Sequence, residues 1–406
     1  MNIWFFNHYA VPPWFYPLAR PYNFAKNLLN KGHDVTIFAA STVHNSDINL
    51  IEDNSLYKVE KIEGIQYVYI KTSNYKNNGI NRIKNMVEYS FKLFKVAKHF
   101  KRPELIIATS VHPLTWVSGY KLSKKYKVRF FAETADLWPE TLVSMGKIKG
   151  NSIPAKLLYK LEKFIYVKAD KLIFTFPGGK DYVKSIGLDS SKVRYINNGV
   201  DIDGFNNDKH NFNYEDVDLD SNHKFKVLYT GSMGTANELS YLIQAAEDLQ
   251  SKGIDRIRFI LFGEGYERVL LEEYVNKNKI TNIIFKGKVD KKFIPSILSK
   301  SDLNIVTGKY IDLYKYGLSL NKLFDYFASG KPTLSNIECG YDMLDEYKCG
   351  LTVKGGSKEA LVEGILKFYN MGKKDYEEYT NNALKSAIDF DYKKLTDQLQ
   401  KVIMEV

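Results

Sequence analysis

Residues 225–246 read FKVLYTGSMGTANELSYLIQAA, which is a short apolar run, a turn with two glycines and the start of a helix. An apolar run that ends in small or polar residues just before a helix is typical of a buried parallel strand and its crossover helix. The pattern recurs in RFILFGEG (258–265), NIIFKGKV (282–289) and DLNIVTG (302–308). The C-terminal half is therefore predicted to form a doubly wound α/β domain.

A similar series of apolar runs fills the first half of the chain: NIWFFNHYA (2–10), HDVTIFAAS (33–41), ELIIATS (104–110), VRFFAET (128–134) and KLIFTF (171–176). A polar, acidic and Asn-rich stretch at 205–222 separates the two series. The 406 residues suit two domains of roughly 200 residues each. We predict an α/β protein with an N-terminal domain at 1–200, a linker at 201–222 and a C-terminal domain at 223–388.

The composition excludes several classes of protein. Hydrophobic residues make up 44% and charged residues 26% of the chain, which is ordinary for a globular protein. The only cysteines, Cys339 and Cys349, lack the partners of a zinc site, and no run of about 18 apolar residues occurs. We expect a cytosolic, reduced protein without a metal centre. The net charge of +11 calls for an anionic partner, such as ligand phosphates, acidic lipid headgroups or nucleic acid.

The segment YGLSLNKLFDYFASGKP (316–332) is the strongest candidate for a ligand site. It predicts a helix that opens after Ser319 and carries Asn321, Lys322 and Asp325 on one side. The free N–H groups of the first turn and the charge of Lys322 suit a diphosphate, and Asp325 suits ribose hydroxyls. A surface helix with a serine cap and a solvated lysine fits the same spacing equally well.

Two glycine-containing turns follow predicted strands, where open parallel sheets bind ligands. Gly231 and Gly234 would let the backbone approach a phosphate closely, although such turns often only join a strand to a helix. Gly263-Glu264-Gly265 is similar to the opening of a dinucleotide fingerprint, but Arg268 replaces its third glycine. No acidic residue closes a strand about 20 residues later. Hydride transfer is therefore disfavoured.

Two histidines, His8 and His112, each follow a predicted strand of the first domain. A single histidine in such a place is usually a hydrogen-bonded or solvated imidazole. Two at the strand ends of one sheet favour a shared site.

Runs of charge allow two further interpretations. Asp216, Asp218 and Asp220 form an Asp-x-Asp pattern, but they lie in the predicted linker, so solvated acids are favoured over a metal site. The segments Lys76–Arg102 and Lys147–Lys171 are strongly basic. The first has helical apolar spacing and suits either an anionic membrane surface or a crossover helix with a solvated basic face.

Together these segments resemble glycosyltransferase family 4, the retaining GT-B transferases, and most of all its capsule and O-antigen branch of fucosaminyltransferase-like enzymes. The resemblance covers essentially the whole chain. It rests on eight segments in one order: NHYAVPP, GHDVTIFAAS, ETADLWPETLVSMGK, LEKFIYVKADKLI, YINNGVD, TGSMGTANELSYLIQAA, FGEGYER and KYGLSLNKLFDYFASGKP.

The resemblance implies two Rossmann-like domains facing a central cleft, with a last helix within 389–406 that returns to the N-terminal domain. It also implies a UDP-sugar donor held mainly by the C-terminal domain, with no metal and no other cofactor. The implied donor-binding residues are Gly231, Ser232, Gly234, Asn237, Gly263, Glu264, Val289, Ser319, Asn321, Lys322 and Asp325. The implied catalytic residues are His8, His112, Asp136 and Lys322, and the acceptor-side residues are Arg20 and Glu133.

The sequence departs from the family at its paired glutamates, where Gly317 and Asp325 stand. Ser232 and Asn237 replace a usual Arg and Lys, so Lys322 and the helix N-termini must carry the diphosphate charge.

Retention implies that the acceptor hydroxyl attacks from the leaving-group face and that a donor phosphate oxygen takes its proton. His8 or His112 would polarise donor-sugar or phosphate oxygens, and Asp136 would orient the acceptor hydroxyl.

We therefore expect transfer of an N-acetylated amino or deoxyamino sugar from UDP to a polyprenyl-diphosphate-linked acceptor, in capsule or O-antigen synthesis. The enzyme would be cytoplasmic and peripheral on the inner face of the cell membrane. A soluble or protein acceptor is one alternative, and a nucleotide-sugar dehydrogenase or epimerase is another. The two-domain pattern disfavours a nucleic-acid partner, and no residue pattern indicates an oligomeric state.

Overall fold

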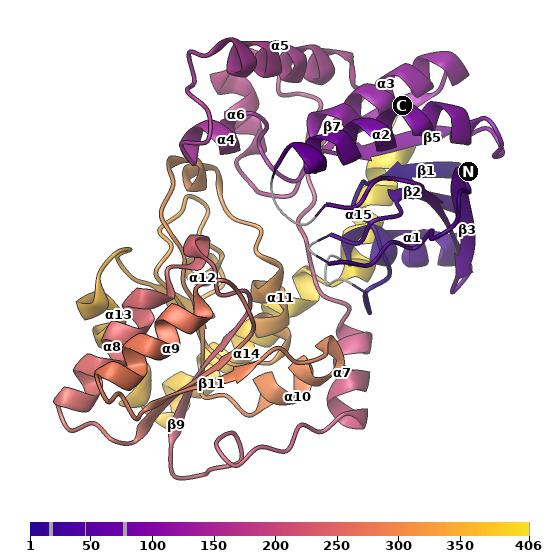
Figure 1. The fold of residues 1–406 in the computed structure, drawn as a ribbon. Coiled ribbons are helices and arrows are strands. Elements are labelled where there is room, and N and C mark those ends of the chain that lie inside the picture. The colour runs from indigo at the N-terminus through magenta and orange to yellow at the C-terminus, as the bar shows by residue number, and fades with distance from the viewer. Residues whose placement is uncertain (16–18, 45, 76–78, 406) are drawn as a thin grey trace. The chain divides into compact units, whose positions relative to one another are not determined.

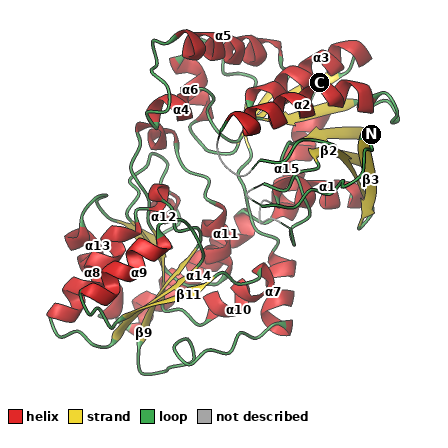
Figure 2. Cartoon of the chain, in the orientation of Figure 1, coloured by secondary structure: helices red, strands yellow, loops and turns green. Residues whose placement is uncertain are grey.

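The computed structural model describes residues 1–15, 19–44, 46–75 and 79–405. The chain divides into two compact units, drawn in Figure 1 by residue number and in Figure 2 by secondary structure. Unit 1 consists of Met1–Asn197 and Leu395–Val406, and unit 2 of Asn198–Lys394. The chain therefore leaves unit 1 once and returns to it once.

The described part of unit 1 contains an eight-stranded sheet in the order β3-β4-β2-β1-β5-β6-β7-β8. Neighbouring strands are parallel except for the antiparallel pair β3 and β4. Strands β1 and β5 are buried along their whole length, as continuous apolar runs predict. The strands are β1 (Asn2–Phe6), β2 (Asp34–Ala40), β3 (Tyr57–Ile62), β4 (Ile65–Ile70), β5 (Leu105–Thr109), β6 (Arg129–Thr134), β7 (Lys171–Phe174) and β8 (Val193–Tyr195).

Helices connect these strands, and the last helix of the chain joins them. They are α1 (Arg20–Asn30), α2 (Ile80–Ala97), α3 (Pro113–Tyr126), α4 (Glu140–Ser144), α5 (Ile153–Lys168), α6 (Gly179–Ser185) and α15 (Tyr392–Met404). Directly after α15, the Glu405 carboxylate lies 2.6 Å from both Lys171 Nζ and Arg194 Nη2. Lys31 pairs with Asp397 of α15 at 2.5 Å. These ion pairs attach α15 to unit 1.

The described part of unit 2 contains a six-stranded parallel sheet in the order β11-β10-β9-β12-β13-β14. Its strands are β9 (Phe225–Thr230), β10 (Ile257–Phe262), β11 (Ile283–Gly287), β12 (Leu303–Val306), β13 (Thr333–Ser335) and β14 (Gly350–Thr352). Crossover helices are required because parallel strands cannot be joined by tight turns. The predicted α/β class with parallel sheets is confirmed.

The helices of unit 2 cover both faces of its sheet (Figure 2). One apolar core lies under α8 (Leu239–Ser251), α9 (Arg268–Lys277) and α13 (Lys358–Tyr369). A second core lies under α7 (Ile202–Asn211), α10 (Ile294–Ser299), α11 (Asn321–Ala328), α12 (Met343–Glu346) and α14 (Lys373–Asp389). Short 3₁₀ turns occur at η1 (Thr235–Asn237), η2 (Lys291–Phe293) and η3 (Asp312–Tyr316).

The predicted linker at 201–222 is instead part of unit 2. Its first residues form α7, whose N-terminus is capped by Asp201 accepting from Gly204 N at 3.1 Å. Asp216 and Asp218 each lie 2.7 Å from Lys286 Nζ on β11. The interpretation as solvated acids was therefore wrong, because a lysine of the sheet neutralises them. The return to unit 1 also comes later than predicted, after Lys394.

Candidate functional site

In unit 2, the loops that follow β9 and β10 pack on each other. Met233 N donates a hydrogen bond to Glu264 O at 2.8 Å. A Cβ at Gly263 would collide with the carbonyl group of Gly231. Gly263 therefore has a packing role, because it lets two backbones approach closely at the carboxyl ends of neighbouring strands.

Lys322, in the first turn of α11, extends across the ring of Tyr229. Its Nζ lies 4.2 Å from the ring centroid and donates to Tyr229 Oη at 3.1 Å. A Cβ on Gly231 would lie 2.6 Å from Nζ, so glycine leaves room for the ammonium group. Desolvation lowers the pKa of Lys322 to about 7, and no carboxylate among the described residues pairs with it. An aromatic ring rather than an acid therefore holds this cation, which suits an anionic ligand.

The N-terminus of α11 begins at Asn321, and no side chain caps it. The N-cap residue is Leu320, and Asn321 is exposed. Ser319 instead accepts from Asn198, whose backbone N lies 3.4 Å from Ser319 Oγ. The serine-cap interpretation was therefore wrong, and the first turn keeps N–H groups of the kind that bind anions.

Asp325 lies one turn after Lys322 and is half-buried. Burial raises the pKa of its carboxyl group, and the charge of Lys291 opposes this shift. The next residue, Tyr326, accepts a hydrogen bond from Thr230 N at 3.0 Å. This contact attaches α11 to the end of β9, where Lys322 lies beside Gly231.

Ser232 and Asn237 bind each other, since Asn237 Nδ2 donates to Ser232 Oγ at 3.0 Å. Tyr229 Oη also donates to Ser232 O at 2.6 Å. A Cβ on Gly234 would lie 3.2 Å from the ring of Tyr266. These residues shape the turn after β9.

Glu264 and Val289 have local partners as well. Arg268, which replaces the third glycine of the fingerprint, forms ion pairs with Glu264 and, at 2.7 Å, with Glu272. This cluster borders Gly287 at the end of β11. Val289 packs against the second core.

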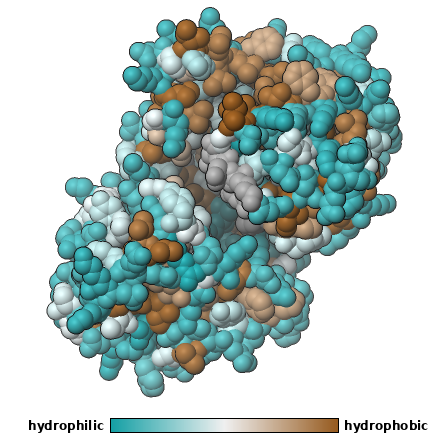
Figure 3. Space-filling view, in the orientation of Figure 1, coloured by the Kyte–Doolittle hydropathy of each residue, from teal (hydrophilic) through white to brown (hydrophobic). Residues whose placement is uncertain are grey.

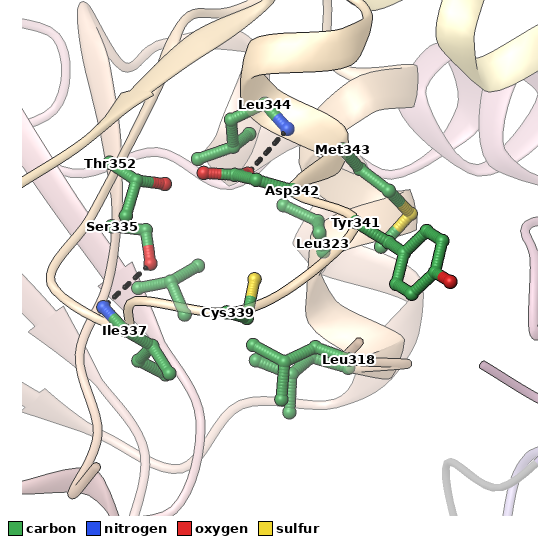
Figure 4. Close-up of a pocket in the computed structure, with 12 residues that line it drawn as sticks. Leu318, Leu323, Ser335, Ile337, Cys339, Tyr341, Asp342, Met343, Leu344 and Thr352 are labelled. Carbon is green, nitrogen blue, oxygen red and sulfur yellow. Dashed lines mark hydrogen bonds between the residues drawn. The ribbon is translucent and has the colours of Figure 1, made fainter. Parts of the chain in front are cut away.

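A separate pocket, partly open to solvent, borders Leu323 of α11 (Figure 4). Its walls are mostly apolar, and Asp342 accepts from Leu344 N at 2.9 Å at its edge. The lining residues are Val306, Leu318, Leu320, Leu323, Ser335, Ile337, Cys339, Tyr341, Asp342, Met343, Leu344 and Thr352. None of the predicted donor residues lines it.

In unit 1, His8 and His112 lie in direct contact after β1 and β5. His112 Nε2 is 3.0 Å from His8 Nδ1, and His8 Nε2 is 2.7 Å from Asn85 Oδ1 of α2. All three side chains are buried. Burial lowers the pKa of His8 to about 3 and that of His112 well below its usual value. Both rings are therefore neutral near pH 7.

Arg20 and Glu133 form a buried ion pair, with 2.7 Å between Nη2 and Oε1. Thr109 Oγ1 donates to Glu133 Oε2 at 2.7 Å. Arg20 also donates to the backbone oxygens of Ile196 at 3.0 Å and Asn197 at 2.5 Å. These contacts give the pair a structural role in unit 1, and its acceptor-side role stays a prediction.

Asp136 lies in the loop after β6, and its side chain is exposed. Its backbone oxygen accepts from Ser110 Oγ at 3.2 Å. This hydrogen bond ties the loop to the end of β5, which places Asp136 at the same edge of the sheet as His112.

The predicted site residues thus lie in both units, and several of them contact one another within a unit. The sequence pattern missed Tyr229, which holds Lys322, and Asn85, which holds His8. Asn85 had a usable signal, because it precedes Tyr89, Leu93 and Ala97 at four-residue spacing on the buried face of α2. Tyr229 had none, because it looks like any other aromatic residue of a buried strand.

Two family models match consecutive parts of the chain. The model described as Glycosyltransferase Family 4 matches residues 21–203, and the model described as Glycosyl transferases group 1 matches residues 214–386. The protein is a glycosyltransferase.

Solved structures confirm that this glycosyltransferase has the predicted GT-B fold. Sucrose-phosphate synthase from Thermosynechococcus elongatus is 17% identical with a TM-score of 0.73, and the match covers 99% of this chain and 98% of that chain. HepE of Anabaena in complex with UDP-glucose is 14% identical with a TM-score of 0.71, and the match covers 100% of both chains. At these identities the likeness concerns the fold alone.

Among curated proteins, the glycosyltransferase is 24% identical over 247 residues to an uncharacterized glycosyltransferase of Methanocaldococcus jannaschii. That match spans 59% of this chain and 59% of the relative. The predicted enzyme class is confirmed, and the dehydrogenase or epimerase alternative is set aside. The capsule and O-antigen branch stays a prediction.

Proposed function

We propose that this glycosyltransferase moves an N-acetylated amino or deoxyamino sugar from a UDP donor to a polyprenyl-diphosphate-linked acceptor in capsule or O-antigen synthesis, with retention of configuration. The observation that supports binding of a UDP-sugar donor is the position of the Lys322 ammonium group. It lies beside Gly231 without an acidic partner among the described residues. The crystal structure of HepE with UDP-glucose adds a nucleotide-sugar complex on the same fold.

The chemistry of the donor explains why a fixed cation matters. Two adjacent phosphates gain negative charge as the glycosidic bond breaks, so positive potential that is already in place stabilises the transition state. Lys322 and the first-turn N–H groups of α11 supply that potential. Asp325, one turn later, would accept hydrogen bonds from ribose hydroxyls. The described residues contain no cluster of three or more His, Cys, Asp or Glu side chains suited to a metal ion.

A thermal-shift panel tests the donor assignment. UDP-, GDP-, CDP- and dTDP-linked sugars are added in turn, and a ligand that binds only the folded state raises the melting temperature. We expect the largest rise with a UDP-linked N-acetylated amino or deoxyamino sugar. The UDP assignment would be contradicted if sugars linked to another nucleotide raised the melting temperature while all UDP-linked sugars raised it equally or not at all.

The surface of α5 supports the proposed contact with a membrane, where a polyprenyl-diphosphate-linked acceptor would lie. Ile153, Leu157 and Phe164 on this helix are 75%, 61% and 43% exposed. Figure 3 shows hydrophobic residues gathered over α5. Four lysines of the same helix are also exposed: Lys156, Lys160, Lys163 and Lys168. Apolar side chains flanked by lysines match an anionic lipid surface.

The basic segment 76–102 also exposes apolar side chains. Its first residues, 76–78, lie outside the described part of the chain. Leu93 and Ala97 are buried, whereas Ile80, Ile83 and Phe91 on α2 are 81%, 60% and 71% exposed. No described helix is both long and apolar enough to cross a membrane. Any membrane contact of the described helices is therefore proposed as peripheral.

Binding to lipid vesicles tests the proposed contact with a membrane surface. We expect the protein to sediment with phosphatidylglycerol-containing vesicles at low salt, and less so as salt screens the lysines. The triple variant Ile153→Ser, Leu157→Ser, Phe164→Ser should bind at least about tenfold more weakly, since each side chain contributes burial free energy. The matched control is Val269→Ser, Leu270→Ser on α9, whose side chains are 62% and 66% exposed. No wild-type binding at low salt would favour a soluble or protein acceptor instead.

A further inference from the structure

A chain of buried hydrogen bonds in unit 1 starts at the side-chain amide of Asn85. Its Nδ2 donates to Ser73 O at 2.6 Å and to Thr42 Oγ1 at 3.1 Å. A flipped amide would put Oδ1 against the carbonyl oxygen of Ser73, and two acceptors cannot bond. The amide orientation is therefore fixed, and Oδ1 faces His8.

Asn85 in turn fixes the tautomer of His8. Asn85 Oδ1 can only accept, so the hydrogen bond of 2.7 Å requires a proton on His8 Nε2. Burial lowers the pKa of His8 to about 3, so the ring carries a single N–H near pH 7. His8 Nδ1 is therefore a bare acceptor.

The tautomer of His112 follows from the same argument. Its Nε2 lies 3.0 Å from His8 Nδ1, so His112 Nε2 must carry the proton and donate. Thr115 Oγ1, 3.3 Å from the same nitrogen, can then only share that proton as an acceptor. Burial and the nearby charge of Arg82 keep His112 neutral. His112 Nδ1 is thus a lone-pair acceptor.

No hydrogen-bond partner for His112 Nδ1 occurs among the described residues, although the atom is buried. A buried acceptor without a partner is costly and calls for an explanation. His112 is also the N-cap of α3 at the carboxyl end of β5, where sheets of this kind bind ligands. A bare acceptor matches a hydroxyl group and mismatches a phosphate or carbonyl oxygen.

We infer that Asn85 and His8 are positioning residues that hold His112 as a hydrogen-bond acceptor for a sugar hydroxyl. This inference rests on the proposed function for the identity of the ligand, but not for the tautomers. It narrows the expectation that His8 or His112 polarises donor-sugar or phosphate oxygens to a contact between His112 and a sugar hydroxyl, because a ring with its only proton on Nε2 has none to offer a phosphate at Nδ1. His8 then acts through His112 and does not touch the ligand.

The tautomers are read directly in the 406-residue chain with ¹⁵N-labelled histidine, by long-range ¹H–¹⁵N correlation near pH 7.5. The chain has seven histidines, and the variants His8→Gln and His112→Gln assign the two sets of signals. We expect both rings as neutral Nε2–H tautomers. A proton on Nδ1 of His112, or a charged ring, would overturn the inference whether or not any donor binds.

The ligand contact is tested by adding a UDP-sugar that raises the melting temperature, and UDP alone as its comparison. We expect the ¹⁵N signal of His112 Nδ1 to shift with the UDP-sugar and not with UDP. No shift at saturation contradicts the hydroxyl contact. If no UDP-sugar binds at all, the donor proposal fails, while the tautomers remain tested by the free protein.

The positioning role is tested by Asn85→Leu, which removes the acceptor that fixes the tautomer of His8. We expect His112 to populate both tautomers and the transfer rate to fall at least about tenfold. Tyr89→Phe is the matched control, because Tyr89 packs edge-on against both rings and its hydroxyl donates to Phe38 O, at 2.8 Å, and not to either histidine. It should change neither tautomer nor rate. Unchanged tautomers in a folded Asn85→Leu variant contradict the role of Asn85.

Discussion

The histidine pair of unit 1 and Lys322 of unit 2 are both surrounded by protein, yet they differ in charge and in how they are held. His8 and His112 are fully buried, neutral and fixed by a chain of hydrogen bonds. Lys322 is half-buried, and among the described residues it contacts the ring and the hydroxyl group of Tyr229. In the proposed reaction, the first arrangement would orient a ligand without supplying charge, and the second would supply charge to an anion. The contrast teaches that hydrogen bonds alone can fix a neutral acceptor, whereas a cation without an acidic partner among the described residues is held by an aromatic ring.

Loss of Lys322 should produce the largest effect. We expect Lys322→Ala to lower turnover by about two orders of magnitude, as is typical when one charge-stabilising group is removed. Steady-state transfer with the preferred donor measures it. Lys315→Ala is the control, because Lys315 is an exposed lysine seven positions earlier and should change little. Near-wild-type turnover of folded Lys322→Ala would remove Lys322 from the donor site.

The pH dependence of donor binding tests the contrast between the neutral histidine pair and the charged Lys322. The pKa of Lys322 is lowered to about 7, so the free protein loses this charge as the pH rises above 7. A bound diphosphate favours the charged form, so the dissociation constant of the donor should rise above pH 7, by at most about tenfold per pH unit. The free energy of unfolding of the free protein should instead increase as the pH rises above 7, since unfolded Lys322 binds a proton that the folded residue releases.

Calorimetric titration between pH 6 and 9 with a UDP-sugar measures this dependence, since its diphosphate does not titrate there. The variant Lys322→Arg should flatten the profile, because a guanidinium stays charged throughout. A flat wild-type profile would mean that Lys322 does not contact the donor.

Gly231→Ala tests whether the position of the ammonium matters as well as its presence. The new Cβ would lie 2.6 Å from Lys322 Nζ and push it aside, so donor affinity should fall by about tenfold, the loss of roughly one charged hydrogen bond. Gly253→Ala is the control for backbone strain, because Gly253 has a φ of +71° and no atom near its Cβ position. Equal donor affinity of the two variants would contradict the steric argument.

The smallest effect concerns the attachment of α15. Glu405→Gln should lower the free energy of unfolding by about 1 kcal/mol, because the carboxylate pairs with Lys171 and Arg194 but is 35% exposed and screened by water. The two cations lower the pKa of Glu405 to about 2, so this stabilisation is present above pH 4.5 and lost as the pH falls toward 2.

Urea unfolding at pH 7 and pH 3 measures both statements about Glu405. Glu377→Gln removes the exposed pair with Lys373 and should leave stability almost unchanged. A larger loss at Glu377 than at Glu405 would contradict the anchoring role of the Glu405 pairs.

The long buried strands were predictable because their apolar runs are continuous. The antiparallel hairpin β3–β4 was missed, since Tyr57–Ile62 alternates charged and apolar residues at the exposed edge of the sheet. Strands β8, β13 and β14 were missed because each has three residues, too few for a visible pattern.

In the candidate site, the sequence identified Lys322 and the two histidines from their places after strands and at a helix start. It could not predict what holds them. Tyr229 and Asn85 act through contacts with residues 93 and 77 positions away, and only the fold brings those partners together. The interpretation of Asp216 and Asp218 as solvated acids failed for the same reason, because Lys286 lies on a strand far along the chain from both.

The return of the chain through α15 makes unit 2 an insertion within unit 1. Unit 2 is a continuous segment, whereas unit 1 lacks its last helix until residues 395–406 have been made. During synthesis, the complete set of residues of unit 2 leaves the ribosome before that of unit 1, although unit 1 begins first. Since domains generally fold as units during translation, the N-terminal domain of this enzyme would be the later of the two to reach its final form.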